Sequence, residues 1–160
     1  MRLYLVRHGE SGPSPFDFER TLTPAGRRAV ARLGDLAARA GVHVEQIRHS
    51  GLVRARETAE ILASRLSPPG GVVEMTGTAP GDDEEAAAIE LSFADAPILL
   101  VTHMPFVARL AGRLVAGRSA VALPFGTAEL RGFERDVAQA SERDGGRWVQ
   151  VLALDSTRDG

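Results

Sequence analysis

Two segments far apart in the chain place a histidine directly after an apolar stretch. Arg7, His8 and Gly9 follow a short apolar run near the start of the chain, and His103 follows the apolar run Pro97–Thr102. A neutral imidazole carries a lone pair that can attack an electrophile, and a guanidinium offers planar donor pairs that match phosphate oxygens. These residue types at these positions favour chemistry on a phosphoryl group.

Two further segments add candidates for the same site. Arg54 follows Ser50 at the start of an amphipathic stretch, and Asp82 belongs to a small acidic cluster that could supply a proton donor. Gly9 would let an oxyanion approach the main chain closely. Guanidinium groups nearby disfavour the imidazolium, so we expect His8 to be neutral, with a free lone pair, at physiological pH.

Each candidate also has a structural interpretation. His103 could cap a helix, Arg54 could pair with Glu57 or Thr58 one turn on, and Asp82 could belong to the acidic first turn of a helix. All 19 basic residues are arginine, so an isolated arginine carries little meaning in this chain. We expect His49 to be exposed to solvent.

The composition excludes several classes of protein. Cysteine is absent, which rules out disulfides, thiolate catalysis and zinc sites built on cysteine. A net charge of -2 gives no reason to expect nucleic acid or an anionic membrane as a partner. The short apolar run at the start is interrupted by Arg7 and is too short for a signal peptide, which predicts a cytoplasmic protein.

The hydrophobic pattern predicts alternating strands and helices. Expected strands are Arg2–Arg7, Val44–His49, Val72–Met75, Pro97–Thr102, Ala128–Phe133 and Arg147–Leu154. Expected helices run from Thr23-Pro24 to Gly41, from after Gly51 to before Ser67, over Glu84–Phe93, and from about Pro105 to Val115. A polar, turn-rich segment that can hold a hairpin joins the last two strands, and the tail Asp155–Gly160 is expected to fray.

This order of elements predicts an α/β fold of three layers. A central, mainly parallel sheet would carry helices on both faces, with the closing pair of strands as the candidates for antiparallel pairing, all in a single domain spanning 1–160. Ligands in such sheets bind beyond the carboxyl ends of the strands. The segments that carry His8, Arg54, Asp82 and His103 all follow predicted strands, so we expect them to meet at one edge.

The motifs together resemble the histidine phosphatase superfamily, the phosphoglycerate-mutase-like enzymes. The resemblance rests on Arg7-His8-Gly9, on the segment Ser50 to Thr58, and on Thr102-His103-Met-Pro105, and it covers nearly the whole chain. The segments Arg20-Thr-Leu-Thr-Pro-Ala-Gly26 and Ala79-Pro-Gly-Asp82 are most similar to those of SixA-type phosphohistidine phosphatases.

The resemblance implies a role for each matching residue. His8 would be the phosphorylated nucleophile, Arg7, Arg54 and His103 would hold the phosphoryl oxygens, and Arg20 would be a further contact. The family usually has proline where this chain has Gly51, which predicts a looser backbone before Arg54. No residue matches the glutamate acid of the larger relatives, and Asp82 is the nearest candidate.

The sequence therefore predicts a phosphatase that needs no metal and no cofactor and acts on a phosphorylated protein, namely a phosphohistidine domain. A small phosphorylated metabolite is the alternative substrate, and the loop Ser11 to Glu19 is the one evident lid for it. A phosphate-binding module without turnover is the alternative outside enzymes. A metal site built on His8, His49 and His103 is disfavoured, because the arginines would repel a cation.

Overall fold

The computed structural model describes residues 1–117, 122–136, 138 and 147–158 of the chain. The strands are β1 (Arg2–Arg7), β2 (Gln46–His49), β3 (Val72–Glu74), β4 (Ile98–Thr102), β5 (Glu129–Asp136) and β6 (Arg147–Asp155). The helices are α1 (Pro24–Arg39), α2 (Val53–Leu66), α3 (Glu84–Ser92), α4 (Phe106–Ala116) and the short 3-10 turn η1 (Asp17–Glu19). In the described residues, no helix has both the length and the apolar character needed to cross a bilayer.

The six strands form one sheet in the order β3-β2-β4-β1-β5-β6. Strands β3, β2, β4 and β1 are parallel to one another. β5 runs antiparallel to β1, and β6 runs antiparallel to β5. The predicted mainly parallel sheet with an antiparallel closing pair is therefore confirmed. In the pairing of β1 with β4, Arg7 lies opposite Thr102, so the two histidines that follow them leave the sheet side by side.

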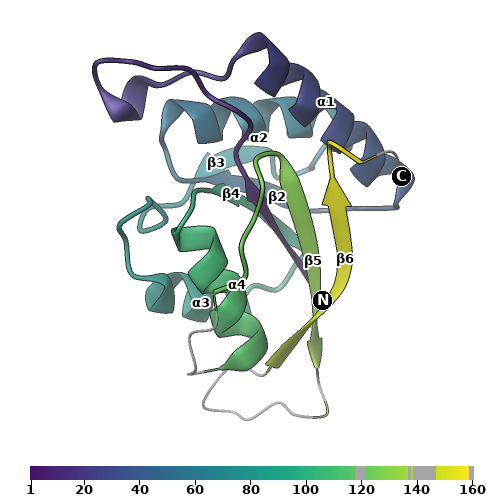
Figure 1. Ribbon diagram of the computed structural model, residues 1–160. Helices are drawn as coiled ribbons and strands as arrows, with labels where there is room; N and C mark the ends of the chain where they lie inside the picture. Colours follow the sequence, from purple (N-terminus) through teal and green to yellow (C-terminus); the bar gives the residue numbers. More distant parts are fainter. Residues whose placement is uncertain (118–121, 137, 139–146, 159–160) are drawn as a thin grey trace.

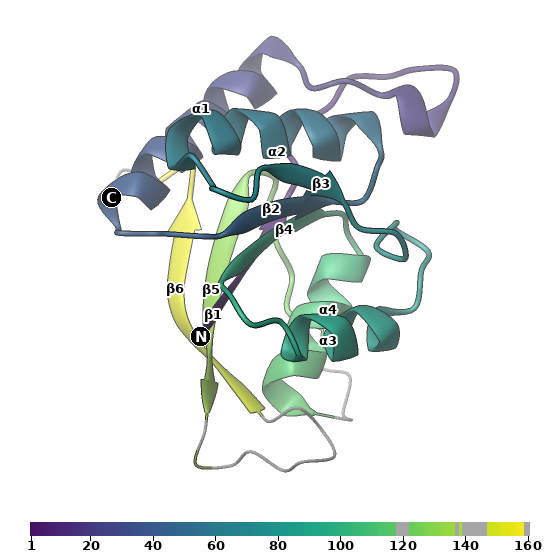
Figure 2. The same cartoon turned by 180° about the vertical axis from the view of Figure 1, so that it is seen from behind.

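Helices cover both faces of the sheet, as Figures 1 and 2 show from opposite sides, and the predicted three layers are confirmed. Alternate residues of β1 enter different cores, as expected for a pleated strand with both faces covered. Leu3 and Leu5 pack on the side of α3 and α4. Tyr4 and Val6 pack on the side of α1 and α2.

The element ends follow local signals closely. Thr23 caps α1 by accepting a hydrogen bond from the Gly26 amide at 2.9 Å, and Pro24 occupies the first helical position.

The turn-rich segment predicted between the last two strands falls largely outside the described residues. The expectation of a frayed tail is wrong for its first residues, because Asp155 ends β6 and the Ser156 side chain is buried.

Gly26 is required because the chain before α1 passes directly over it. A Cβ placed on Gly26 would lie 2.2 Å from the Glu10 carbonyl oxygen, which belongs to the backbone and cannot rotate away. We expect Gly26→Ala to destabilise the fold by about 2 kcal/mol or more, measured by urea unfolding. Gly81→Ala is the control, because its Cβ would meet nothing within 4 Å. Equal midpoints for the two variants would contradict this close contact.

Candidate active site

His8 and His103 lie side by side at the carboxyl edge of the sheet. Their ring centroids are 5.0 Å apart and the planes are tilted by 51°. The His8 amide donates to the Thr102 carbonyl at 3.1 Å, which extends the pairing of β1 with β4 by one residue. Both side chains are buried, and both follow the last residue of a strand. The convergence expected from the topology therefore holds for these two residues.

The His8 ring is held so that one nitrogen faces the site. Its Nδ1 lies 2.7 Å from the Gly9 carbonyl oxygen, which accepts hydrogen bonds but cannot donate one. Nδ1 therefore carries the proton and Nε2 keeps its lone pair. The Arg54 Nε atom lies 3.4 Å from His8 Nε2, as a donor facing an unprotonated nitrogen. This tautomer leaves Nε2 free as a base or nucleophile.

Burial is the main reason why His8 stays neutral. The pKa of His8 is lowered to about 4: burial is the largest cause, the Gly9 hydrogen bond opposes it, and the charges of Arg54, Arg7 and Arg20 add to it. The sequence interpretation named the guanidinium charges alone. It predicted the lowered pKa of His8 correctly but omitted burial, which is the larger cause.

His8 is accordingly expected to titrate well below an ordinary histidine. Proton NMR of the imidazole signal, assigned with His8→Ala, is expected to give a midpoint near 4. The unfolded chain takes up this proton near pH 6.5, so stability is full above that pH and falls as the pH drops towards 4. A midpoint at or above 6.5 would contradict the buried, neutral ring.

His103 is oriented by Ser50, at the end of the neighbouring strand β2. The Ser50 Oγ atom lies 2.5 Å from His103 Nε2. His103 Nδ1 is buried and has no hydrogen-bond partner among the described residues. Burial and then the neighbouring His8 lower the pKa of His103 to about 3. When Ser50 donates to Nε2, the neutral ring carries its proton on Nδ1.

Arg54 reaches the histidines from the first turn of α2 and is held by the loop before α1. Its Nη1 donates to the Asp17 carbonyl at 2.8 Å, and its Nη2 lies 3.2 Å from the Asp17 carboxylate. The Thr58 hydroxyl donates to the Arg54 carbonyl oxygen and does not touch the guanidinium. Glu57 pairs with Arg27. The alternative of an Arg54 pair within its own helix is therefore wrong.

Asp17 is a site residue that sequence reasoning missed. Its carboxylate contacts both Arg54 and Arg20, the latter at 3.3 Å. Asp17 lies in a loop without a hydrophobic pattern, and its partner Arg54 is 37 residues away in the chain. Nothing in the sequence therefore indicated that Asp17 belongs to the site. Burial works against the change, but the charges and hydrogen bonds of Arg54 and Arg20 lower the pKa of Asp17. The group is therefore a carboxylate at neutral pH.

Two further arginines surround the histidines. Arg7 is half-buried, its Nη1 donates to the Phe125 carbonyl at 2.8 Å, and its Nε is buried without a partner in the described part of the chain. Arg20 donates from Nε to the Gly12 carbonyl at 3.0 Å. Both guanidinium groups lower the pKa of His8, which places them within electrostatic reach of its ring. The cluster is strongly cationic and suits an oxyanion.

Gly9 and Asp82 make contacts other than those expected. The Gly9 amide donates to the Thr58 hydroxyl at 3.1 Å, and a Cβ on Gly9 would lie 2.7 Å from Val30 Cγ2. Close packing on α1 therefore explains the glycine. The Asp82 carboxylate accepts from the Ala79 amide at 2.9 Å and closes that turn. A phosphate contact for Gly9 and a proton-donating role for Asp82 stay predictions.

The turn before Arg54 is held by a bond that proline could not make. The Gly51 amide donates to His49 Nδ1 at 3.0 Å, and Gly51 has a φ of 93°, outside the range of proline. The expected looseness is therefore not seen, because a side chain fixes the turn. The expectation that His49 is exposed is wrong, since its side chain is buried.

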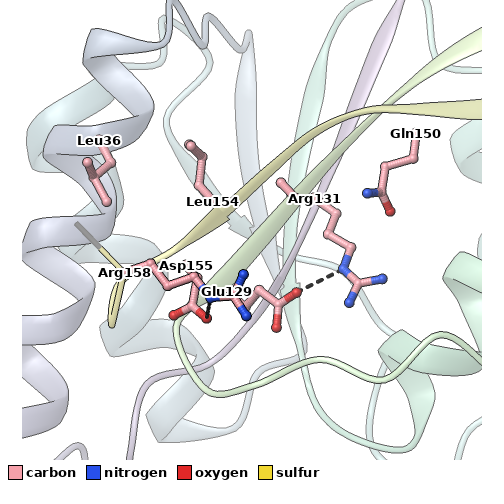
Figure 3. A pocket seen from close by; sticks show the side chains of 8 residues that line it. Leu36, Glu129, Arg131, Gln150, Leu154, Asp155 and Arg158 are labelled. Carbon is pink, nitrogen blue, oxygen red and sulfur yellow. Dashed lines mark hydrogen bonds and ion pairs between the residues drawn. The ribbon is translucent and has the colours of Figure 1, made fainter. Parts of the chain in front are cut away.

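A hollow lies between α1 and strands β5 and β6. Its volume is about 620 Å³, and Leu36, Glu129, Arg131, Leu154, Asp155 and Arg158 are among its lining residues (Figure 3). The Arg131 Nε atom lies 2.9 Å from Glu129, and Arg158 pairs with Asp155. Its described lining residues include no histidine, and each of its two arginines pairs with a carboxylate, so this hollow lacks the imidazoles of the histidine cluster. The histidine cluster is therefore the candidate active site.

The described residues contain no group of three metal-ligating side chains close enough to hold a metal ion. The cluster instead combines two neutral imidazoles with guanidinium groups. Such a set of donors matches an oxyanion of tetrahedral shape better than a cation. It places an unprotonated imidazole nitrogen among positively charged groups.

The fold is the α/β fold of the histidine phosphatases. The chain belongs to the histidine phosphatase superfamily, whose branch 1 model matches residues 3–75. An uncharacterized protein of Picosynechococcus sp. is 33% identical over 127 residues, which are 74% of this chain and 76% of that protein.

Two solved structures show the same fold. The protein histidine phosphatase SixA, complexed with tungstate, has a TM-score of 0.85 at 20% identity and covers 98% of this chain and 97% of its own. A mycobacterial glucosyl-3-phosphoglycerate phosphatase has a TM-score of 0.70 at 18% identity, with 94% of this chain and 97% of its own covered. The two relatives act on different phosphorylated compounds, so the fold alone leaves the substrate open.

Proposed function

We propose that this chain hydrolyses phosphohistidine in proteins through a phosphorylated His8, without a metal ion or cofactor. The observation that carries the proposal is the pair of neutral rings 5.0 Å apart, with the His8 Nδ1 proton held by Gly9 and Nε2 facing Arg54. An unprotonated nitrogen beside a fixed guanidinium is the arrangement that attack on phosphorus requires.

The first step transfers the phosphoryl group between two imidazoles. His8 Nε2 forms a bond to phosphorus while the bond to the substrate nitrogen breaks in line with it. The substrate enters with its phosphohistidine ring protonated, and this ring leaves as a neutral imidazole. The positive charge passes to the His8 ring, whose Nδ1 proton stays at the Gly9 carbonyl. Arg7 and Arg54 neutralise the charge on the phosphoryl oxygens, His103 contacts these oxygens as a neutral ring, and Arg20 is an outer contact.

The second step is the hydrolysis of phospho-His8. Water forms a bond to phosphorus, the bond from phosphorus to Nε2 breaks, and the protons of the water remain with inorganic phosphate. His8 returns to its neutral form. Neither step needs a strong acid, because the leaving group in each is an imidazole and not an alkoxide.

The ionisation of Asp17 favours a substrate whose leaving group is a nitrogen. Asp17 is ionised at neutral pH, since Arg54 and Arg20 lower its pKa, so it is a poor proton donor for an alkoxide. An alkyl phosphate would lose the roughly 10²- to 10⁴-fold that general acid catalysis supplies. This reasoning favours phosphohistidine over the phosphate esters of small metabolites.

The experiment is to label the purified enzyme and compare substrates. Brief incubation with ³²P-phosphoramidate is expected to give an acid-labile label in the peptide that contains His8. A phosphohistidine protein is then expected to have a kcat/KM about 10²-fold or more above those of nucleotide, sugar and glycerate phosphates. Equal rates would remove the substrate proposal and keep the reaction class. Absence of label would remove the mechanism.

A small-molecule phosphatase is the second candidate. It is favoured by the similarity in fold to the glucosyl-3-phosphoglycerate phosphatase, which acts on a small metabolite. In that case the panel would show one phosphate ester turned over faster than protein phosphohistidine.

A further inference from the structure

Two phenylalanines lie exposed on the turn that holds Arg54. Phe16 and Phe18 are 58% and 55% exposed, and their ring centroids are 5.7 Å apart. They flank Asp17, the residue whose carbonyl and carboxylate both contact Arg54. Figures 1 and 2 show this turn, η1, standing out from the body of the protein beside α2. We call these two side chains the aromatic rim.

The aromatic rim is fixed relative to the candidate active site. Arg54 is buried, and its guanidinium lies between His8 and Asp17, so the turn is tied to the group expected to hold the phosphoryl oxygens. Arg20, the residue that follows η1, adds two bonds, to Gly12 and to Asp17. One guanidinium group therefore separates His8 from the turn that carries these rings.

The chemistry of the rings indicates what they meet. Two adjacent exposed phenyl rings gain free energy by leaving water, and exposed aromatic side chains beside a site are typical of contact surfaces for other proteins. A phosphorylated sugar or glycerate is polar throughout and cannot cover them. A folded protein that presents its phosphohistidine on an apolar surface can.

We propose that the aromatic rim, Phe16 and Phe18, is the docking surface for the protein that carries the phosphohistidine substrate. This inference rests on the proposed function and adds where the partner binds. The rim recognises apolar surface around the modified residue, whereas the histidines and arginines recognise the phosphoryl group itself. Free phosphohistidine, which has no surrounding surface, gains nothing from the rim.

The chain offers a matched control. Phe93 is 69% exposed, but it lies beside Gln46 and Ile98, the first residues of β2 and β4, and so at the opposite edge of the sheet from the histidines. Replacing Phe93 removes a similar exposed ring far from the candidate active site. The comparison separates an effect of position from a general effect of lost surface apolarity.

The test compares a protein probe with a small probe. The protein probe is a four-helix phosphotransfer domain phosphorylated on its histidine, and the small probe is free phosphohistidine. In F16S/F18S the ratio of their kcat/KM values, protein over free, is expected to fall about tenfold or more. F93S is expected to keep the ratio of the wild type, and F16Y/F18Y, which keeps both rings, is expected to stay within about threefold of it. Thermal melting checks that each variant is folded.

Two results would overturn the docking surface. One is an unchanged ratio in F16S/F18S, and the other is a loss in F16S/F18S for a nucleoside monophosphate instead of the protein, which would mean that the rings stack on a base. Labelling separates this failure from that of the proposed function. If the enzyme is labelled by ³²P-phosphoramidate but the ratio is unchanged in F16S/F18S, only the docking proposal is contradicted. If the enzyme is not labelled, both the docking proposal and the proposed function are contradicted.

Discussion

Replacing His8 with alanine is expected to abolish turnover. The variant should form no acid-labile phosphoenzyme, and kcat should fall by about 10⁴-fold or more, as expected when a covalent nucleophile is removed. The reason is geometric: His103 is the other ring in the cluster, but its Nε2 is engaged by Ser50 at 2.5 Å. It is therefore not a ready substitute nucleophile. Rapid-quench labelling and phosphate release measure the two effects.

Binding of an oxyanion is expected to survive in the same variant. Arg7, Arg54 and His103 remain, so calorimetry with tungstate should still give a measurable Kd for His8→Ala. His43→Ala is the control, because His43 is exposed, and it should behave as the wild type does. Phosphate release by His8→Ala at the wild-type rate would exclude His8 as the nucleophile. Oxyanion binding by a wild type that shows no turnover would favour the phosphate-binding module instead.

The sequence was sufficient for the parts of the site that are set by topology. His8 and His103 follow strongly apolar strands, and parallel strands bring their carboxyl ends to one edge, so their proximity follows from the pattern alone. Arg54 was found in the same way, because it opens the helix after β2. These predictions depend on hydrophobic periodicity, which the sequence displays directly.

The contacts that depend on side chains in loops could not be predicted. Asp17 and Arg54 are 37 residues apart, and nothing in the loop before α1 indicates which of its polar groups turns inward. His49 was expected to be exposed, but its ring is buried and accepts a hydrogen bond from the Gly51 amide. Such pairings follow from the packed structure and not from any period in the sequence.

Replacing Arg54 with alanine is expected to lower kcat/KM by about 10³-fold, within the range found when one charged donor to a transition state is removed. Arg54 is buried and its Nε lies beside His8 Nε2, so its charge is held next to the expected nucleophile. Steady-state kinetics with phosphohistidine measures the loss. The effect should be mainly on kcat, because positive charge is needed most when the phosphoryl group is in transfer.

Arg56→Ala is the matched control on the same helix. Arg56 is exposed and pairs with Glu60 at 3.7 Å, an arrangement that contributes little to stability or to the site. Its kinetics should stay within about twofold of the wild type, since its guanidinium is exposed and its charge is screened by salt. Equal losses in Arg54→Ala and Arg56→Ala would mean that general electrostatics, and not the local contact, is responsible.

Arg54→Ala also has a second readout that a purely structural role would not produce. Burial is the first cause that lowers the pKa of His8, and the Arg54 charge lowers it further. Removing that charge should therefore raise the NMR midpoint of His8 from its wild-type value near 4 towards 6.5.

Arg54→Lys should keep much of this electrostatic effect, because the charge remains, while losing the paired contacts to Asp17 that only a planar fork makes. A low midpoint with a reduced kcat in Arg54→Lys would thus separate the two tasks of this residue: holding the nucleophile neutral and gripping the phosphoryl oxygens. An unchanged midpoint in Arg54→Ala would show that burial alone keeps His8 neutral.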